Sequence, residues 1–301
     1  MNCQHYYNGL RQDYNLNTNT RLVESFRTHN WPECEAKITW NGTSMIEHIL
    51  TKKKWPGEKD RIYTHEFVVR NLELLLLFTN PAPFTGMIMT SDNGMCNSPK
   101  IPIIEHSRSP LKNSILLPLH PNQVWFWAKN YSTNKVTLNN SNCVWYGSRT
   151  GYANIQSKFN VNRTRCSGFM TDRECVVNMN LPNVRFGTHP TYLKNDCMLA
   201  IDGNAYAGSF KTALFHQKLA VRIGGFSKGH RLSSYEWFEP FLQPDIHYIQ
   251  TTIDMLHETL QRVAKMSMQK KQQIAMNGHK AFMALINKTS ISCYVNLVVK
   301  A

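Results

Sequence analysis

The chain of 301 residues has no long hydrophobic run, and apolar stretches such as residues 74–78 are short. A helix that crosses a bilayer needs about 20 predominantly apolar residues, so no transmembrane segment is predicted. No apolar signal-peptide core follows Met1, and no retention signal occupies the last residues. From these absences we expect a cytoplasmic protein.

The sequence also lacks closely spaced cysteine pairs, because none of its eight cysteines forms a Cys-x-x-Cys motif. No histidine spacing completes a zinc site either, so no metal centre is predicted. Without an export signal, the cysteines are expected to be mostly reduced thiols in a reducing compartment. Five Asn-x-Ser/Thr sequons are present, but chance explains them in a chain this rich in asparagine, and they matter only in a secreted protein.

Two common nucleotide-binding signatures are absent, the Walker A loop and the Gly-x-Gly-x-x-Gly fingerprint. P-loop hydrolysis and Rossmann-type dinucleotide binding are therefore not supported. Acidic residues are scarce as well, with 20 Asp and Glu against 34 Lys and Arg, so the net charge of +14 attracts anionic partners. The basic residues are dispersed rather than clustered on one element, which disfavours a nucleic-acid-binding protein.

Apolar periodicity predicts strands that alternate with helices, which is the pattern of a parallel α/β protein. The hydrophobic fraction of 42% is sufficient for a packed core, and the charged fraction of only 18% argues against disorder. A polar stretch within 119–142 predicts a boundary between a domain at 1–138 and a domain at 139–301. We expect strands at 37–40, 86–90, 101–104, 114–117, 144–146, 199–201 and 218–223, and helices at 20–28, 63–78, 209–215, 253–263 and 274–285.

Two turns in the second half follow predicted strands and carry glycines, so their backbone N–H groups are candidates to bind phosphate. The first turn contains Gly147, Ser148, Arg149 and Thr150. The second turn begins at Asp202 and Gly203 and continues to Ser209, Phe210 and Lys211. Taken alone, the first turn is better explained as a solvent-exposed turn with a surface arginine. The second turn is more informative, because it concentrates two glycines, a hydroxyl and a cation after one strand.

Four motifs follow one another along the second half of the chain. They read Trp-Tyr-Gly-Ser-Arg-Thr-Gly at 145–151, Ile-Asp-Gly-Asn…Ser-Phe-Lys at 201–211, Glu-Trp-Phe…Leu-Gln-Pro-Asp-Ile-His-Tyr at 236–248 and Ala-Met-Asn-Gly-His-Lys-Ala-Phe at 275–282. In this order the motifs resemble those of glycosyltransferase family 90, which includes protein O-glucosyl- and O-xylosyltransferases and capsule xylosyltransferases. The resemblance covers roughly residues 86–285.

The resemblance implies a GT-B architecture, in which two Rossmann-like α/β domains face each other across a cleft. Domain 1–138 would hold the acceptor and domain 139–301 the nucleotide sugar, while the last helix often crosses back to the first domain. The implied activity is inverting transfer of xylose or glucose from UDP-xylose or UDP-glucose to a hydroxyl group of a glycan. No Asp-x-Asp motif is present, so no cofactor and no catalytic metal are expected.

The resemblance also implies a carboxylate that acts as the general base at the end of a strand in the first domain. The family pattern is an apolar run followed by Asn-x-x-Asp, and Met-Ile-Met-Thr-Ser-Asp at 87–92 is similar to it. Asp92 is therefore the candidate base. The competing interpretation is an aspartate that stabilises the Asp-Asn-Gly turn at 92–94. Without a base in place, the chain would be a non-catalytic nucleotide- or glycan-binding protein with a degenerate transferase fold.

Residues that match the family's donor contacts form the predicted nucleotide-sugar site. They are Gly147, Ser148, Arg149, Thr150, Arg163, Asp202, Gly203, Ser209, Phe210, Lys211 and Glu236. Lys211 stands where the family has an arginine, and a lysine keeps the charge but loses the bidentate fork. Tyr146 and Asp245 also depart from the family pattern. Glu236 is interpreted equally well as a ribose ligand or a surface charge, and Arg163 as a diphosphate ligand or a surface residue.

Overall fold

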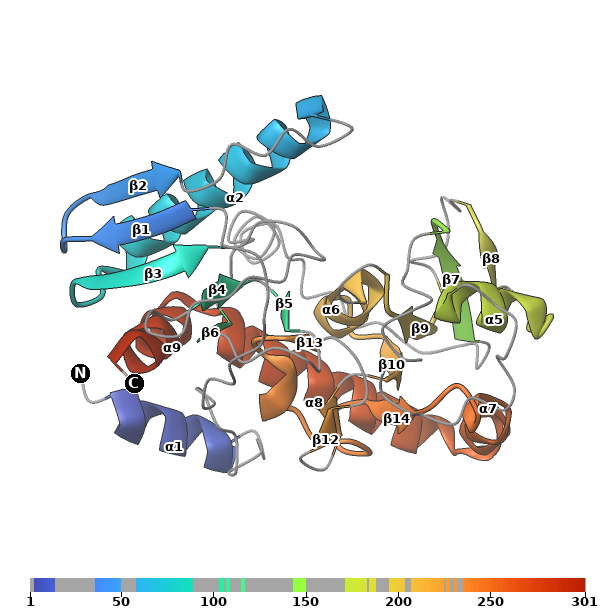
Figure 1. The fold of residues 1–301 in the computed structure, drawn as a ribbon. Helices are drawn as coiled ribbons and strands as arrows, with labels where there is room; N and C mark the ends of the chain where they lie inside the picture. The colour runs from blue at the N-terminus through green and yellow to red at the C-terminus, as the bar shows by residue number, and fades with distance from the viewer. Residues whose placement is uncertain are drawn as a thin grey trace. The chain divides into compact units, whose positions relative to one another are not determined.

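The structure is a computed structural model, and its contacts divide the chain into two compact units (Figure 1). Unit 1 comprises Met1–Asp13, Thr18–Tyr131 and Ala284–Ala301, and unit 2 comprises Tyr14–Asn17 and Ser132–Met283. The structure describes residues 3–13, 36–49, 58–88, 103–105, 107–108, 115–116, 143–149, 171–182, 184–187, 195–203, 207–224, 226–227, 230–231 and 235–300.

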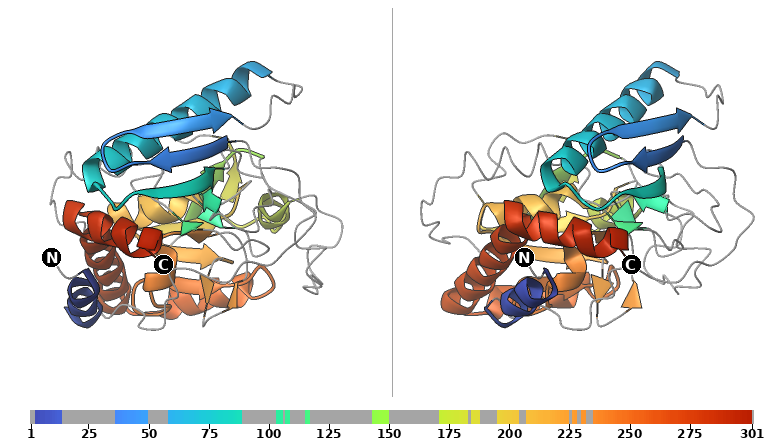
Figure 2. Two further views of the ribbon diagram at one scale, coloured as in Figure 1. Left: turned by 60° about the vertical axis from the view of Figure 1, so that its left-hand side comes forward. Right: turned by 90° about the vertical axis from the view of Figure 1, so that its left-hand side faces the viewer.

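Unit 1 contains a mixed five-stranded sheet of order β2-β1-β3-β4-β6. Strand β1 pairs antiparallel with β2 and β3, whereas β4 pairs parallel with β3 and β6. Helix α2 lies alongside β1, β2 and β3 (Figure 2). The elements of unit 1 are α1 (Cys3–Asp13), β1 (Ala36–Trp40), β2 (Met45–Ile49), α2 (Glu58–Thr79), β3 (Phe84–Ile88), β4 (Ile103–Glu105), β5 (Ser107–Arg108), β6 (Ile115–Leu116) and α9 (Lys288–Lys300).

The core of unit 1 follows the two periodicities of its sequence. In β1, alternate side chains point to opposite faces, so Ile38 and Trp40 are buried while the residues between them are not. In α2, Leu72, Leu75 and Leu76 are fully buried at helical spacing. Helix α9 contacts both α1 and α2. The predicted strand at 37–40 and the predicted helix at 63–78 are therefore confirmed, while the helix predicted at 20–28 lies outside the described residues.

Unit 2 contains a second five-stranded sheet, of order β14-β10-β9-β7-β8, in which every neighbouring pair of strands is parallel. Strands β9 and β10 are buried along their whole length, as expected for parallel strands covered on both faces. The elements of unit 2 are β7 (Cys143–Gly147), α5 (Asp172–Asn178), β8 (Val184–Phe186), β9 (Cys197–Ile201), α6 (Gly208–Phe215), β10 (Leu219–Ile223), β11 (Phe226–Ser227), β12 (His230–Arg231), β13 (Tyr235–Glu236), η2 (Glu239–Phe241), β14 (Ile249–Thr251), α7 (Leu256–Lys265) and α8 (Met268–Ile286).

The strand order of unit 2 creates a topological switch point between β7 and β9. The chain places β8 on one side of β7 and then returns to place β9, β10 and β14 on the other side. This is the 2-1-3-4-5 order of a doubly wound sheet, in which ligands bind at the carboxyl ends of the two strands that flank the reversal. The predicted α/β class is confirmed for this unit, and the GT-B arrangement of two facing domains remains a prediction.

Disulfide bonds occur in both units. Cys3 is bonded to Cys293 in unit 1, and Cys143 is bonded to Cys197 between the adjacent strands β7 and β9 of unit 2. Cys175 is disulfide-bonded as well, so all the described cysteines are oxidised. The expectation of reduced thiols is wrong for these residues, because partners 54 and 290 positions apart leave no local spacing signal. Disulfides are typical of oxidising compartments, which counts against the reducing compartment expected above.

None of the described helices combines the length and the apolar character that a membrane span requires.

Candidate functional site

The two predicted glycine turns lie at the switch point of unit 2. Strand β7 ends at Gly147 and is followed by Ser148 and Arg149. The neighbouring strand β9 is followed by Asp202 and Gly203. Both Ser148 and Arg149 are exposed. A Cβ atom on Gly147 would lie 2.6 Å from the indole ring of Trp145, so only glycine fits after this tryptophan. The fold therefore brings residues 147 and 202, which are 55 positions apart in the sequence, to the ends of adjacent strands.

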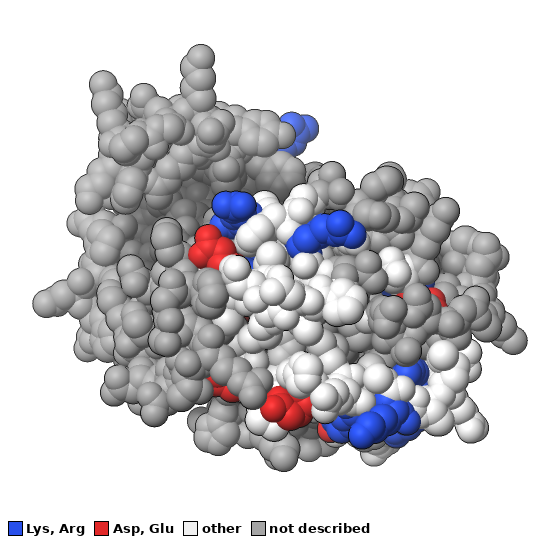
Figure 3. Space-filling view, turned by 90° about the vertical axis from the view of Figure 1, so that its right-hand side faces the viewer, with Lys and Arg blue, Asp and Glu red and all other residues white. Residues whose placement is uncertain are grey.

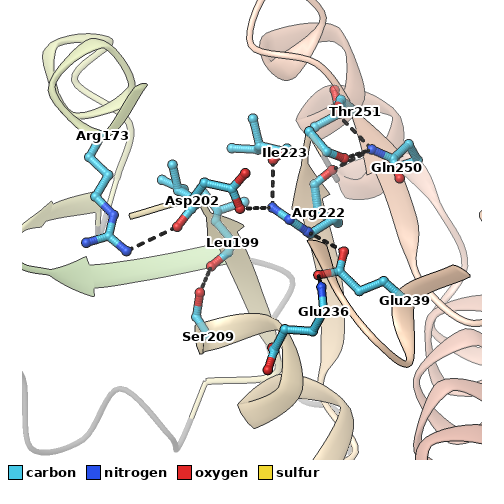
Figure 4. A network of polar contacts seen from close by, with 12 residues as sticks. Arg173, Leu199, Asp202, Ser209, Arg222, Ile223, Glu236, Glu239, Gln250 and Thr251 are labelled. Carbon is cyan, nitrogen blue, oxygen red and sulfur yellow. Dashed lines mark hydrogen bonds and ion pairs between the residues drawn. The ribbon is translucent and has the colours of Figure 1, made fainter. Parts of the chain in front are cut away.

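A buried arginine organises the end of β9 from the next strand. The Arg222 side chain is fully buried on β10, and its Nη1 lies 2.6 Å from Oδ1 of Asp202. Its Nε donates to Oε2 of Glu239 at 3.1 Å, and Nη1 also donates to the Ile223 carbonyl at 2.9 Å. Figure 4 shows Asp202 between Arg222 on one side and Arg173 on the other. A charge buried this deeply is tolerated only because carboxylates and a carbonyl surround it.

The carboxyl group of Glu239 titrates in an unusual range. Burial raises the pKa of Glu239 from its ordinary value to about 7, while the positive charge of Arg222 acts in the opposite direction. Its other oxygen, Oε1, accepts the backbone N–H of Glu236 at 3.0 Å. Glu239 therefore connects the arginine on β10 to the segment that carries Glu236.

Lys211 and Glu236 form a second buried ion pair. The Lys211 ammonium lies 2.8 Å from Oε1 of Glu236, and the two side chains are 5% and 7% exposed. The sequence predicted Lys211 as a diphosphate contact, and the structure directs its ammonium to Glu236. Glu236 is buried rather than the surface charge of the alternative interpretation. Its Oε2 atom is also buried and has no hydrogen-bond partner among the described residues, so it can accept a ligand hydroxyl.

Two further predicted residues lie at the start of helix α6. The Ser209 hydroxyl donates to the Leu199 carbonyl at 3.1 Å and ties the helix to β9. Phe210 is fully buried and stacks near Phe238 and Tyr248, so its side chain belongs to the core. Ala207 occupies the N-cap and makes no side-chain cap bond, so this position does not cap the N–H groups of the first turn. Of the donor-site residues predicted in unit 2, Thr150 and Arg163 lie outside the described residues.

Asp92, the predicted base, also lies outside the described residues. Among the residues that the structure does describe, no three His, Cys, Asp or Glu side chains come close enough together to hold a metal ion. On the face shown in Figure 3, the described Lys and Arg side chains stand in separate groups, with uncharged and acidic residues between them. A continuous positive stripe for nucleic acid is not formed by the described residues of this face.

Sequence reasoning missed Arg173, Arg222 and Glu239. A signal existed for Arg222, because it is the one charge in the otherwise apolar strand Leu-Ala-Val-Arg-Ile, and a buried charge requires partners. Neither Arg173 nor Glu239 has such a signal, since Arg173 bonds Ile201 28 positions away and Glu239 bonds Arg222 17 positions away.

The carboxyl edge of the sheet combines groups whose chemistry is compatible with a phosphorylated ligand. Backbone N–H groups at α6 and the exposed Arg149 suit an anion, and the buried Oε2 of Glu236, which has no hydrogen-bond partner among the described residues, suits a hydroxyl. These groups surround a switch point at which ligands commonly bind. The function has to be argued from this geometry, because comparison with models of known protein families and with curated proteins finds no match.

Proposed function

We propose that the chain is an inverting glycosyltransferase that moves xylose or glucose from a UDP-sugar to a hydroxyl group of a glycan acceptor. The observation that carries the proposal is the switch point between β7 and β9 in unit 2. Both glycine turns that match the family motifs lie there, at the ends of adjacent parallel strands. The proposed arrangement is GT-B, with unit 2 as the donor-binding domain.

The donor diphosphate would lie against the turns after β7 and β9. Arg149 and the Ser148 hydroxyl would contact the diphosphate from the turn after β7. The amides at Gly203 and at the start of α6 would contact it from the turn after β9. Arginine suits this position because its planar fork bonds two phosphate oxygens at once. Glu236 would accept a ribose hydroxyl through Oε2, while Lys211 holds its other oxygen. Thr150 and Arg163 are proposed to contribute further diphosphate contacts.

The proposed reaction needs a base and a stabilised leaving group. Asp92 takes the proton from the acceptor hydroxyl, whose oxygen then attacks the anomeric carbon from the face opposite the nucleotide. The bond from that carbon to the β-phosphate oxygen breaks, and UDP leaves with the electron pair. The transition state resembles an oxocarbenium ion, as in glycoside hydrolysis. Fixed amides and arginines that face the developing phosphate charge lower the barrier. No metal is required for any of these steps.

The test is a screen of the purified protein for donor binding and turnover. Thermal stability and UDP release are measured with UDP-xylose, UDP-glucose, ADP-glucose and GDP-mannose, each with and without EDTA. We expect one UDP-sugar to raise the melting temperature selectively, because a ligand that binds only the folded state stabilises it. Slow release of UDP from the same donor, unchanged by EDTA, would support transfer without a metal.

The other outcomes are equally informative. A selective thermal shift without any release of UDP, even with glycan acceptors, would favour the non-catalytic nucleotide- or glycan-binding protein. Release that EDTA abolishes would replace the metal-independent mechanism with a metal-dependent one. If none of the nucleotide sugars binds, the proposed function is overturned and the resemblance to family 90 concerns the fold alone.

A further inference from the structure

Arg173 occupies the switch point of unit 2 and was assigned no function above. It stands in the first turn of helix α5, whose N-cap Thr171 accepts the backbone N–H of Glu174 at 3.1 Å and so fixes the start of the helix. From there the side chain reaches over the ends of two strands. Its guanidinium lies 5.3 Å from the centre of the Trp145 ring, which supports the flat face of the group.

The guanidinium of Arg173 joins the ends of β7 and β9. Its Nη1 donates to the Ser148 carbonyl at 3.2 Å, and its Nη2 donates to the Ile201 carbonyl at 3.3 Å. These two carbonyls belong to the two turns that flank the switch point. One planar group therefore bonds both turns at once, which a single ammonium cannot do with the same geometry.

The neighbouring glycine leaves room for this contact. A Cβ atom on Gly203 would lie 2.8 Å from Nη2 of Arg173, closer than real Cβ contacts allow. The absence of a side chain at Gly203 is thus matched to the position of Arg173. Asp202 attracts the guanidinium electrostatically from the same turn, while its carboxylate is paired with Arg222.

The contact also changes which backbone groups remain for a ligand. Carbonyl oxygens at the carboxyl ends of strands carry negative partial charge and repel an anion. Arg173 covers the carbonyls of Ser148 and Ile201 and adds a positive charge. An anion at the switch point would then meet amides and cations instead of bare carbonyls.

We propose that Arg173 is a positioning residue for the donor site. It ties the turn after β7 to the turn after β9, and so holds Ser148, Arg149 and Gly203 in the arrangement that receives a nucleoside diphosphate. The identity of the ligand rests on the proposed function, whereas the tie between the two turns is a property of the free protein. The two parts can therefore fail separately.

The experiment compares Arg173→Ala, Arg173→Lys and Gly203→Ala with the control Arg185→Ala. Arg185 is a matched control because it also stacks on an aromatic ring, that of Tyr146, but it donates to no strand-end carbonyl among the described residues. Amide hydrogen exchange is measured in the free proteins over residues 146–149 and 201–203. UDP affinity, KM for the donor and kcat are measured on the same variants.

We expect Arg173→Ala to speed exchange in both turns by about tenfold or more, because both lose the same tether. The UDP dissociation constant and KM should rise by about tenfold, while kcat at saturating donor changes less than about threefold. In exchange rate and UDP affinity, Gly203→Ala should behave like Arg173→Ala. Arg173→Lys should lie between Arg173→Ala and the wild type. Arg185→Ala should match the wild type.

Unchanged exchange in both turns of Arg173→Ala and Gly203→Ala would overturn the tether. Faster exchange with an unchanged UDP dissociation constant would overturn the positioning role. If the wild type binds no UDP at all, the proposed function fails, and the exchange measurements still decide whether Arg173 joins the two turns. A kcat that falls as steeply as KM rises would contradict positioning and assign Arg173 a direct part in the transition state.

Discussion

The two units differ in the direction of their strands, and this difference separates their expected roles. In unit 1, β1 runs antiparallel to both neighbours, so its carboxyl end lies at the edge opposite to the carboxyl ends of β2, β3, β4 and β6. In unit 2 all neighbouring strands are parallel, so every carboxyl end lies at one edge. Parallel strands need long crossover connections, and those connections deliver glycine turns and helix starts to that edge. A ligand site built from several strand ends is therefore expected in unit 2.

The largest expected effect would separate catalysis from donor binding. Replacing Asp92 with Asn removes the proposed base, and a positioned general base contributes roughly 10²- to 10⁴-fold to rate. We expect kcat for transfer to fall by that factor while UDP binding, assigned to unit 2, is unchanged. The measurement is transfer of radiolabelled sugar together with calorimetric UDP titration. Asp245→Asn is the control, because that carboxylate is exposed and pairs only with Arg262 among the described residues. Transfer retained by Asp92→Asn would exclude Asp92 from the mechanism.

The second prediction concerns the stability of the parallel sheet. Arg222→Met leaves the buried carboxylates of Asp202 and Glu239 without their shared cation. Breaking a buried ion pair from one side typically costs about 3–5 kcal/mol of unfolding free energy. Arg262→Met removes an exposed pair with Asp245 in the same unit and should cost no more than about 1 kcal/mol. Urea unfolding of both variants measures the difference.

A cost below about 1 kcal/mol for Arg222→Met would show that the two carboxylates become protonated and tolerate the loss. That result is favoured only if Glu239, whose pKa burial raises to about 7, already carries a proton at neutral pH. Repeating the unfolding at a series of higher pH values distinguishes the cases: loss of Arg222 removes the charge that lowers the pKa of Glu239, so a variant that folds with protonated Glu239 loses stability as pH rises.

The sequence predicts this sheet better than the site at its edge. Strands β9 and β10 are evident because each is a five-residue segment that is apolar, apart from Arg222 in β10, and that ends near a glycine. Strand β8 and helix α5 were not predicted, since three and seven residues are too few for a clear period. The glycine turns could be placed because they follow strands along the chain. The partner of Lys211 could not, because Glu236 lies 25 positions away and only the packing of α6 brings them together.

The third prediction compares the disulfides of the two units. Cys143→Ser with Cys197→Ser should lower the unfolding free energy of unit 2 by about 2–4 kcal/mol, the usual cost of losing a native disulfide. Cys3→Ser with Cys293→Ser should cost roughly 1.5 kcal/mol more in unit 1, because its bond closes a separation of 290 rather than 54 residues. Denaturant unfolding and mass spectrometry of alkylated thiols test both. Free thiols at these four positions in the native protein would contradict the disulfides and agree with the reduced cysteines expected from the sequence.

The smallest expected effect concerns two histidines at the opposite edge of the unit 2 sheet. His216 follows α6, and His279 on α8 contacts the Leu214 carbonyl through Nδ1 at 3.0 Å. Burial lowers the pKa of both side chains below 6.5, and Lys218 lowers that of His216 further. The folded state therefore favours the neutral rings. As pH falls below 6.5, the unfolded chain takes up protons first, and folded stability decreases.

We expect the unfolding free energy of unit 2 to decrease between about pH 7 and about pH 5 because of these two rings. The double variant His216→Gln with His279→Asn should flatten that slope, because neither replacement titrates. His257→Asn, an exposed position on α7, should leave the slope as it is in the wild type. Urea unfolding at a series of pH values gives the three slopes. A slope that persists in the double variant would assign the acid sensitivity to other groups. Glu239 is not one of them, because its raised pKa makes protonation stabilise the folded state as pH falls.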